Sequence, residues 1–224
     1  METLTVKGEA LLKVRPDTTR FSISMELKEK DYATLMKKAD RELKKITGAI
    51  TDCGFKDEDI KTENVNVSPV YESVRDEKGE YRQVFSGYSY MQRMYVSFDL
   101  DNVLLSRLVS EIYSTDTLLD IDISFTLKDT RKWEEELIKK AVEDATRKAE
   151  IIAGSTGSVL GGIGYIRYNM ADSSFADMGR VTLSRAKNSV MEEALDLAYS
   201  PTDIELRDNI EICWDLIGKK GNIV

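Results

Sequence analysis

The 224-residue chain contains no histidine. Histidine is the usual general base of Ser- and Cys-dependent nucleophile systems, a common zinc ligand and the side chain that titrates near neutral pH. Its absence excludes the Ser–His–Asp and Cys–His catalytic systems, imidazole zinc sites and imidazole pH switches.

Cysteine is almost as scarce, because Cys53 and Cys213 are the only two. They are too far apart for a CxxC pair and too few for a four-cysteine zinc cage. We expect two buried thiols that behave as small hydrophobic residues, with a disulfide between them as the alternative.

Long hydrophobic runs are also missing. No window approaches the 18 or so apolar residues that a membrane-spanning helix needs. Residues 1–8 do not show a basic segment followed by an apolar one, so the chain as it reads is expected to be cytoplasmic. A signal segment removed earlier would instead place it in the periplasm or cell envelope.

Positive charge is in deficit, with 40 Asp and Glu against 32 Lys and Arg and a net charge of −8. This balance opposes binding to phosphate backbones, so we expect no nucleic-acid partner. A group of tyrosines could form a stacking platform, but such platforms need accompanying basic charge and the neighbouring residues are acidic. The tyrosines are Tyr71, Tyr81, Tyr88, Tyr90 and Tyr95, and the acidic neighbours are Glu72, Asp76, Glu77 and Glu80.

Three segments resemble chemical motifs without completing them. The glycines of residues 154–164 follow a predicted helix and lead into a strand, whereas a phosphate loop precedes its helix. Residues 57–63 resemble a calcium loop, but Lys61 and Thr62 replace the required ligand and glycine. Asp17 after Pro16 is typical of a turn. We therefore predict no catalytic, cofactor or metal residues, although paired carboxylates that meet only in space remain an alternative.

What the sequence does have is clear periodicity. Alternating apolar residues predict strands with one buried face, which favours antiparallel sheets. The alternating sets are Phe21 to Leu27, Tyr88 to Leu100 with a break at Gln92, Leu119 to Leu127, and Ile210 to Leu216.

Helical spacing appears in three segments. Residues 31–53 have Asp31 as the expected N-cap and Gly54 as the stop, and residues 102–113 predict a shorter helix. In residues 130–153 small residues recur every four positions, which favours close packing on the chain's own sheet, with an oligomer face as the alternative. That stripe comprises Trp133, Leu137, Ala141, Ala145, Ala149 and Ala153.

These elements predict an α+β fold in which largely antiparallel sheets pack against two long helices and one short helix. We expect one domain over residues 1–224, with two intimately packed α+β subdomains as the alternative. Residues 172–200 form a long excursion between the last two strands, with a helix predicted over 184–198. An excursion of this length is the first place to expect a partner site.

Several short motifs resemble, in order and spacing, the SIMPL-domain family of unknown function. They are Val6-Lys7-Gly8-Glu9, Arg15-Pro16-Asp17, Gly54-Phe55, Asp59-Ile60-Lys61-Thr62, Val67-Ser68-Pro69-Val70-Tyr71, Phe85-Ser86-Gly87-Tyr88, the alanine-striped helix and Pro201-Thr202-Asp203-Ile204. Gly8, Pro16, Gly87 and Tyr88 match the motifs and are expected to serve turns and packing.

The resemblance implies an α+β fold without established catalytic residues, and relatives that include periplasmic immunogenic and oxidative-stress-defence proteins, some of them ring-like or channel-like homo-oligomers. We therefore expect a non-enzymatic bacterial protein, with a role in the stress response, that acts through homo-oligomerisation and protein contacts. A small-ligand or envelope-binding module, or an enzyme using carboxylate, Tyr or Lys chemistry, is the alternative.

Overall fold

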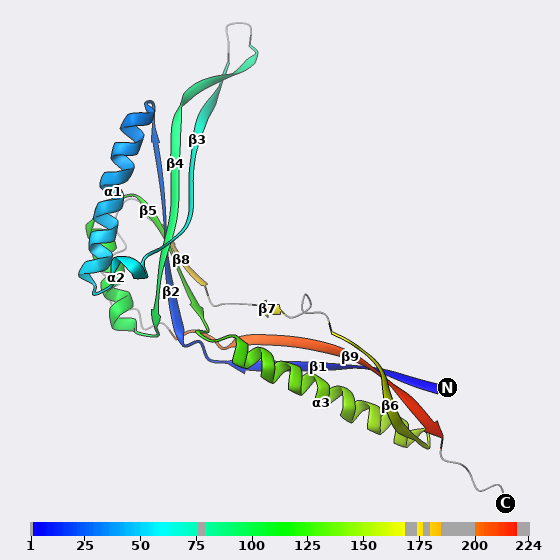
Figure 1. Cartoon of the computed structure of the whole chain (residues 1–224). Helices are drawn as coiled ribbons and strands as arrows, with labels where there is room; N and C mark the ends of the chain where they lie inside the picture. Colours follow the sequence, from blue (N-terminus) through cyan, green and yellow to red (C-terminus); the bar gives the residue numbers. More distant parts are fainter. Residues whose placement is uncertain (1, 76–78, 169–173, 177–179, 185–199, 219–224) are drawn as a thin grey trace, which may run out of the picture. The chain divides into compact units, whose positions relative to one another are not determined.

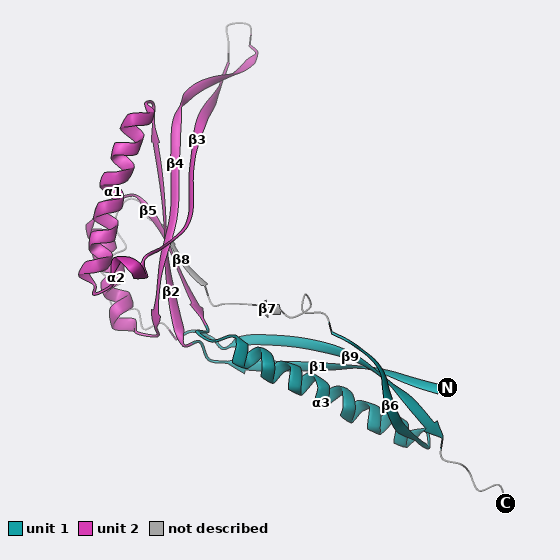
Figure 2. Ribbon diagram, in the orientation of Figure 1, with its two compact units in different colours: residues 1–16, 127–179, 201–224 teal, residues 17–126, 180–200 magenta. Residues whose placement is uncertain are grey.

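The computed structural model describes residues 2–75, 79–168, 174–176, 180–184 and 200–218 (Figure 1). The chain divides into two compact units, drawn in different colours in Figure 2. Unit 1 comprises Met1–Pro16, Leu127–Gly179 and Pro201–Val224, and unit 2 comprises Asp17–Thr126 and Arg180–Ser200. Each unit combines an antiparallel sheet with helices, so the predicted α+β class is confirmed.

The sheet of unit 1 joins the two ends of the chain. Its strands are β1 (Glu2–Val14), β9 (Ile204–Gly218), β6 (Ser158–Arg167) and the short β7 (Ser174–Ala176), in the order β1-β9-β6 with β7 also on β9. All pairings are antiparallel, and β1 pairs with β9 along its whole length.

Helix α3 (Arg131–Ser155) packs on this sheet through its alanine stripe. Ala141, Ala145, Ala149 and Ala153 are almost completely buried. Packing on the chain's own sheet is therefore confirmed, and the oligomer-face alternative is wrong for these residues because they are not accessible. The core also includes Val6, Leu137, Leu206, Ile210, Ile212 and Trp214.

Unit 2 is a five-stranded antiparallel sheet covered on one face by two helices (Figure 1). The strands are β2 (Thr18–Glu29), β3 (Lys61–Arg75), β4 (Tyr81–Asp99), β5 (Leu119–Thr126) and β8 (Arg180–Ser184), in the order β3-β4-β2-β5-β8. The helices are α1 (Tyr32–Asp52) and α2 (Asn102–Ser114), and a 3-10 turn, η1 (Asp57–Asp59), precedes β3. Core side chains include Phe21, Ile23, Leu35, Ile46, Ile50, Met94, Leu108, Ile112 and Ile123.

The helix boundaries follow from capping chemistry. The Asp31 carboxylate accepts hydrogen bonds from the Thr34 backbone N–H at 2.8 Å and from the Thr34 hydroxyl at 2.9 Å, which lowers the pKa of Asp31. Beyond the other end of α1, Gly54 has φ of +103°, where glycine is favoured. The predicted boundaries of α1 are thus confirmed, and those of α2 and α3 hold to within two residues.

Gln92 does not break the buried face of β4, contrary to the expectation from its polarity. Its side chain is buried in the same row as Tyr90 and Met94. The Tyr90 hydroxyl donates to Gln92 Oε1, and Gln92 Nε2 lies 3.4 Å from Thr62 Oγ1. The amide keeps its inward position because it has hydrogen-bond partners there.

The two cysteines are free and buried, as expected, and burial raises the pKa of the Cys53 thiol.

Residues 172–200, predicted as a long excursion between the last two strands, include two short strands. These are β7 and β8, which pair with β9 and β5. The helix predicted over 184–198 cannot begin at Ser184, since that residue ends β8. The remainder of that predicted helix lies outside the described residues.

Candidate functional site

The hairpin of β3 and β4 is longer than the sheet that supports it. Strand β2 ends at Glu29, which pairs with Tyr88, whereas β3 and β4 continue pairing as far as Arg75 and Tyr81. We call residues 70–75 and 81–87 the arm. Figure 1 shows the arm extending past the start of α1 and the end of β2. It is therefore a two-stranded ribbon, a form that is only marginally stable when isolated in water.

A bulge marks the base of the arm. Gly87 pairs with Val70 and Phe85 pairs with Tyr71, so Ser86 is an extra residue in β4. Gly87 has φ of +148°, and a Cβ there would lie 2.4 Å from the carbonyl oxygen of Glu29. Glycine is therefore required where the arm leaves the sheet.

Aromatic rings form a continuous row from α1 onto the arm. The ring of Tyr32, the first residue of α1, lies 5.5 Å from Tyr88 between centroids. Tyr88 lies 5.2 Å from Phe85, and Phe85 lies 5.9 Å from Tyr71. All three contacts are edge-to-face, the geometry that aromatic pairs prefer.

Most rings of the row are accessible, and Tyr32 on the helix is itself 50% exposed. The exposed fractions are 56% for Tyr71, 47% for Phe85 and 73% for Tyr81 farther along the arm. If a ring residue presents about 200 Å², these three side chains expose about 350 Å² together. Val74 and Val84 are half-exposed on the same ribbon. Tyr71, Phe85 and Tyr81 lie on one face of the ribbon, whereas Val74 and Val84 lie on the opposite face, because neighbouring residues of a strand point to opposite sides. An exposed apolar area of about 350 Å² is comparable to the largest patch of an ordinary soluble protein, and such patches are often functional.

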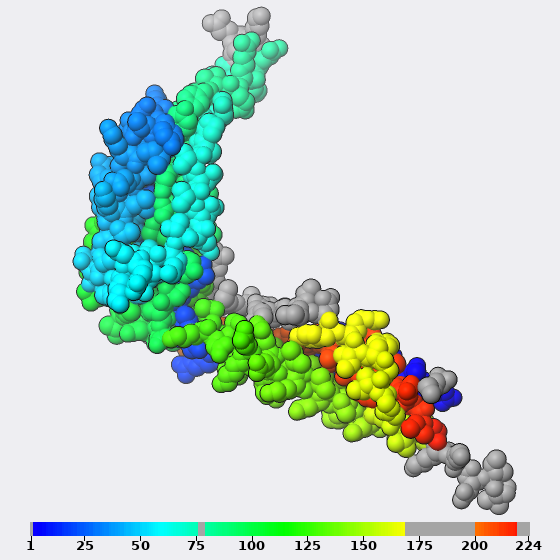
Figure 3. All heavy atoms as spheres, in the orientation of Figure 1, coloured from blue at the N-terminus to red at the C-terminus, as the bar shows by residue number. Residues whose placement is uncertain are grey.

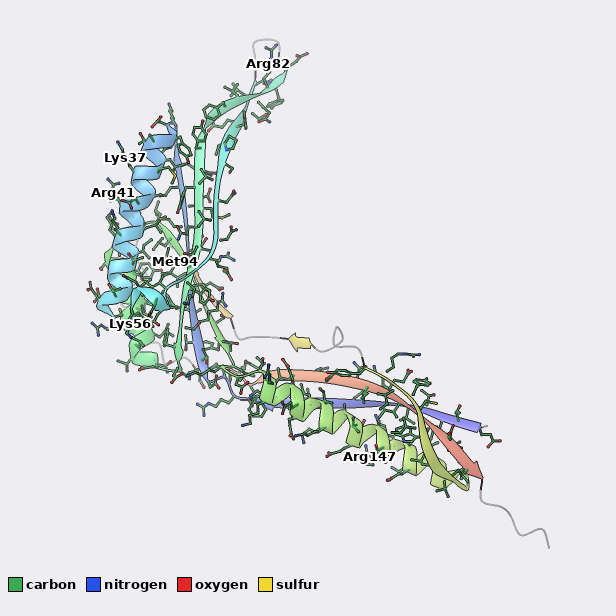
Figure 4. All side chains as sticks on the ribbon, in the orientation of Figure 1. Lys37, Arg41, Lys56, Arg82, Met94 and Arg147 are labelled. Atoms are coloured by element: carbon green, nitrogen blue, oxygen red, sulfur yellow. The ribbon has the colours of Figure 1, made fainter. Side chains whose placement is uncertain are left out.

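Side-chain hydrogen bonds involve polar groups of the arm. The Ser86 hydroxyl donates to the Glu72 carboxylate at 2.7 Å, linking β4 to β3. Arg75 Nε donates to the Gly79 carbonyl at 3.2 Å. Figure 3 shows β3 and β4 continuing beyond α1 with no other described element over them on the face in view, and Figure 4 labels Arg82 on the distal part. The arm thus presents exposed rings and valines together with polar side chains that include Glu72, Arg75 and Arg82.

The free backbone edge of β3 is a less suitable contact than these side chains. Pro69, paired with Tyr88, has no N–H to donate. Proline occurs in edge strands where the missing donor faces outward, so it interrupts the row of outward donors. Side chains of the arm, rather than strand addition along the whole of β3, are therefore the candidate contact.

The five tyrosines noted in the sequence do not form one platform. Tyr71, Tyr81 and Tyr88 belong to the arm and its base, whereas Tyr90 is buried in the core. The guanidinium of Arg20 lies 3.6 Å from the ring centroid of Tyr95 and covers that face of the ring. Sequence reasoning missed Tyr32 and Phe85, which complete the row.

The structure shows where the segments that only resemble chemical motifs lie. Helix α3 ends at Ser155 and β6 begins at Ser158, so the glycine segment is a helix stop and strand entry. Asp17 lies between β1 and β2, where its backbone N–H donates to the Thr126 carbonyl at 3.2 Å and its carbonyl accepts from the Leu100 N–H at 3.1 Å. These are long-range backbone bonds and not the bonds of the predicted turn. Among the described residues, no group of three Cys, Asp or Glu side chains is placed to hold a metal ion.

The largest pKa shifts belong to groups with structural partners. Burial alone would raise the pKa of Glu42, but hydrogen bonds from Lys45, Thr117 and Arg41 outweigh it and lower the value to about 2. In unit 1, burial and the Asp208 carboxylate raise the pKa of Tyr168 to about 12. The Tyr168 hydroxyl donates to Asp208 at 2.8 Å. Both shifts are explained by burial and by hydrogen bonds to the neighbouring side chains.

No helix within the described ranges is both long enough and apolar enough to cross a membrane.

The chain is an α+β protein of the SIMPL family. Residues 4–214 match the model of that family, whose description reads "Protein of unknown function (DUF541)". The match covers nearly the whole chain, so the chain belongs to the family, and the resemblance seen in its motifs is confirmed.

Two kinds of curated relative are similar to it. The 26 kDa periplasmic immunogenic proteins of Brucella melitensis and Brucella abortus are 24% and 23% identical over 159 residues, 70% of this chain and 63% of each relative. The chain thus spans less than two thirds of their length. The uncharacterized protein YggE of Edwardsiella ictaluri is 22% identical over 219 residues, 93% of this chain and 84% of that protein.

Proposed function

We propose that this protein is a non-enzymatic bacterial SIMPL protein that acts by associating with copies of itself, and that the arm is the contact. The observation that carries the proposal is the row of exposed rings on a two-stranded ribbon. Self-association is preferred to an unrelated protein partner because the family resemblance implies homo-oligomers. A role in the stress response rests on that resemblance alone and is not part of the proposal.

The energetics support a contact that uses the whole arm. Burying about 350 Å² of ring surface contributes about 9 kcal/mol at about 25 cal/mol per Å². Association costs about 4–15 kcal/mol in lost translational and rotational freedom. The rings alone are therefore marginal, and a stable contact also covers Val74 and Val84 on the opposite face of the ribbon.

The periplasm or cell envelope is the compartment that we propose. Two of the relatives are named as periplasmic proteins. This favours the alternative location over the cytoplasm expected from the opening residues.

Replacing two arm tyrosines by lysine tests the contact. In Tyr71→Lys/Tyr81→Lys, two charges stand where the proposal buries rings, so we expect self-association to weaken at least about a hundredfold. Sedimentation equilibrium would show the wild type above the 25.4 kDa of one chain and the variant at that mass.

A matched control places the same charges on exposed apolar positions of unit 2 outside the arm. Val103 and Leu118 are 80% and 60% exposed, so Val103→Lys/Leu118→Lys adds the same charge in place of exposed apolar side chains. The control should keep the wild-type mass. A monomeric wild type, or an arm variant that assembles normally, would refute the proposal.

A further inference from the structure

The outer edge of β1 is occupied by side chains of α3. The Glu9 backbone N–H donates to Asp144 Oδ2 at 3.0 Å, and Lys148 Nζ donates to the Lys7 carbonyl at 3.3 Å. Strand β1 pairs with β9 on its other side. In an antiparallel strand the backbone groups of every second residue point to the same side. The Lys7 carbonyl and the Glu9 N–H therefore point to one side, away from β9 and toward the side chains of α3.

Close packing brings the helix within reach of the edge. A Cβ on Gly8 would lie 2.0 Å from the Ala141 carbonyl oxygen and 2.7 Å from the Ala145 Cβ. Only glycine on the strand and small residues on the helix permit this approach. Asp144 and Lys148 then stand on α3 beside residues 7–9 of the strand.

The two side chains are held in place by each other. Lys148 Nζ lies 2.7 Å from the Asp144 carboxylate, and Arg147, labelled in Figure 4, donates to it at 2.7 Å. The hydrogen bond from Lys148, followed by that from the Glu9 N–H, lowers the pKa of Asp144 to about 2. The carboxylate is therefore ionised and accepts hydrogen bonds at every ordinary pH.

We propose that Asp144 and Lys148 form a clasp that closes the β1 edge to strand pairing with a second copy of this chain. An unprotected edge strand is a template for another strand, and β1 is long, with 13 residues. The clasp occupies one outward donor and one outward acceptor at the middle of that strand. Like Pro69 on β3, it directs association away from open sheet edges and toward side-chain surfaces.

Removing the clasp should open the edge. The test is made in the Tyr71→Lys/Tyr81→Lys background, so that contacts through the arm do not contribute. In the added pair Asp144→Ala/Lys148→Ala, amide exchange at Glu9 should accelerate about tenfold at low concentration, because a charge-assisted hydrogen bond is lost. At higher concentration the mean mass in sedimentation velocity should rise above that of the background protein.

Two further variants separate pairing at β1 from simple loss of stability. Glu136→Ala/Lys140→Ala removes another ion pair of α3, four residues apart at 3.7 Å, and should leave mass and Glu9 exchange unchanged. Adding Glu9→Pro to the protein that lacks the clasp removes the outward-facing N–H of residue 9. No hydrogen bond to β9 is lost, because that N–H faces away from β9, and the mass should return to that of the background protein. A clasp-less protein with unchanged mass and exchange, or association that Glu9→Pro does not suppress, would overturn the clasp while leaving the arm contact untouched.

Discussion

Gly8→Ala is expected to destabilise unit 1 by about 3 kcal/mol, the cost of forcing a methyl group into a closely packed contact. The added Cβ would meet the backbone carbonyl of Ala141 at 2.0 Å, and backbone cannot rotate out of the way as a side chain can. Both tryptophans of the chain, Trp133 and Trp214, belong to unit 1. Urea unfolding followed by tryptophan fluorescence therefore reports on this unit directly.

Gly48→Ala is the control, because Gly48 belongs to unit 2 and its replacement should leave the tryptophan-monitored midpoint of unit 1 unchanged. Gly48 lies inside α1, and nothing stands within 4 Å of its added Cβ. There the change should stabilise unit 2 by about 0.5–1 kcal/mol, since glycine costs entropy within a helix. A Gly8→Ala midpoint equal to that of the wild type would show that α3 is not in close contact with β1 at this point.

Acid is expected to weaken unit 2 through Glu42, which joins α1 to the segment before β5. Glu42 Oε2 accepts from Thr117 Oγ1 at 2.8 Å and from Lys45 Nζ at 2.9 Å, and the side chain is buried. The folded pKa is about 2 against 4.5 for the free group. A lowered pKa gives stability that is present above pH 4.5 and lost as the pH falls toward 2, about 3 kcal/mol in all.

Glu42→Gln removes this dependence. Denaturant unfolding monitored by circular dichroism should show the variant about 3 kcal/mol less stable than the wild type at neutral pH, with the gap closing toward pH 2. Asp40→Asn in the same helix is the control, because the Asp40–Lys44 pair is largely exposed and should matter little. A constant difference between Glu42→Gln and the wild type across this pH range would contradict the account of Glu42.

The features that the sequence predicted well are those determined by local chemistry. Asp31 and Gly54 bound α1 because capping and left-handed backbone are properties of single residues. The alternation of Phe21, Ile23 and Met25 identified the buried face of β2, since every second side chain of a strand points the same way. The alanine stripe likewise predicted which face of α3 is buried.

Features that depend on partners distant in the sequence were not predictable in this way. The pairing of β1 with β9 joins residues about 200 positions apart, and nothing in either periodicity specifies the other strand. The arm exists because β3 and β4 continue beyond the end of β2. This difference depends on the lengths and the register of the paired strands, which composition does not specify. Asp144 is one of many acids in the sequence, and nothing in the helical spacing indicates that it accepts from the Glu9 N–H, 135 positions away.

The most direct test of arm-mediated association is amide hydrogen exchange measured over a series of protein concentrations. The account predicts that exchange in residues 70–75 and 81–87 slows as concentration rises, whereas exchange in α2, which lies outside the arm, stays constant. Arm exchange that is independent of concentration while the protein is assembled would contradict the account.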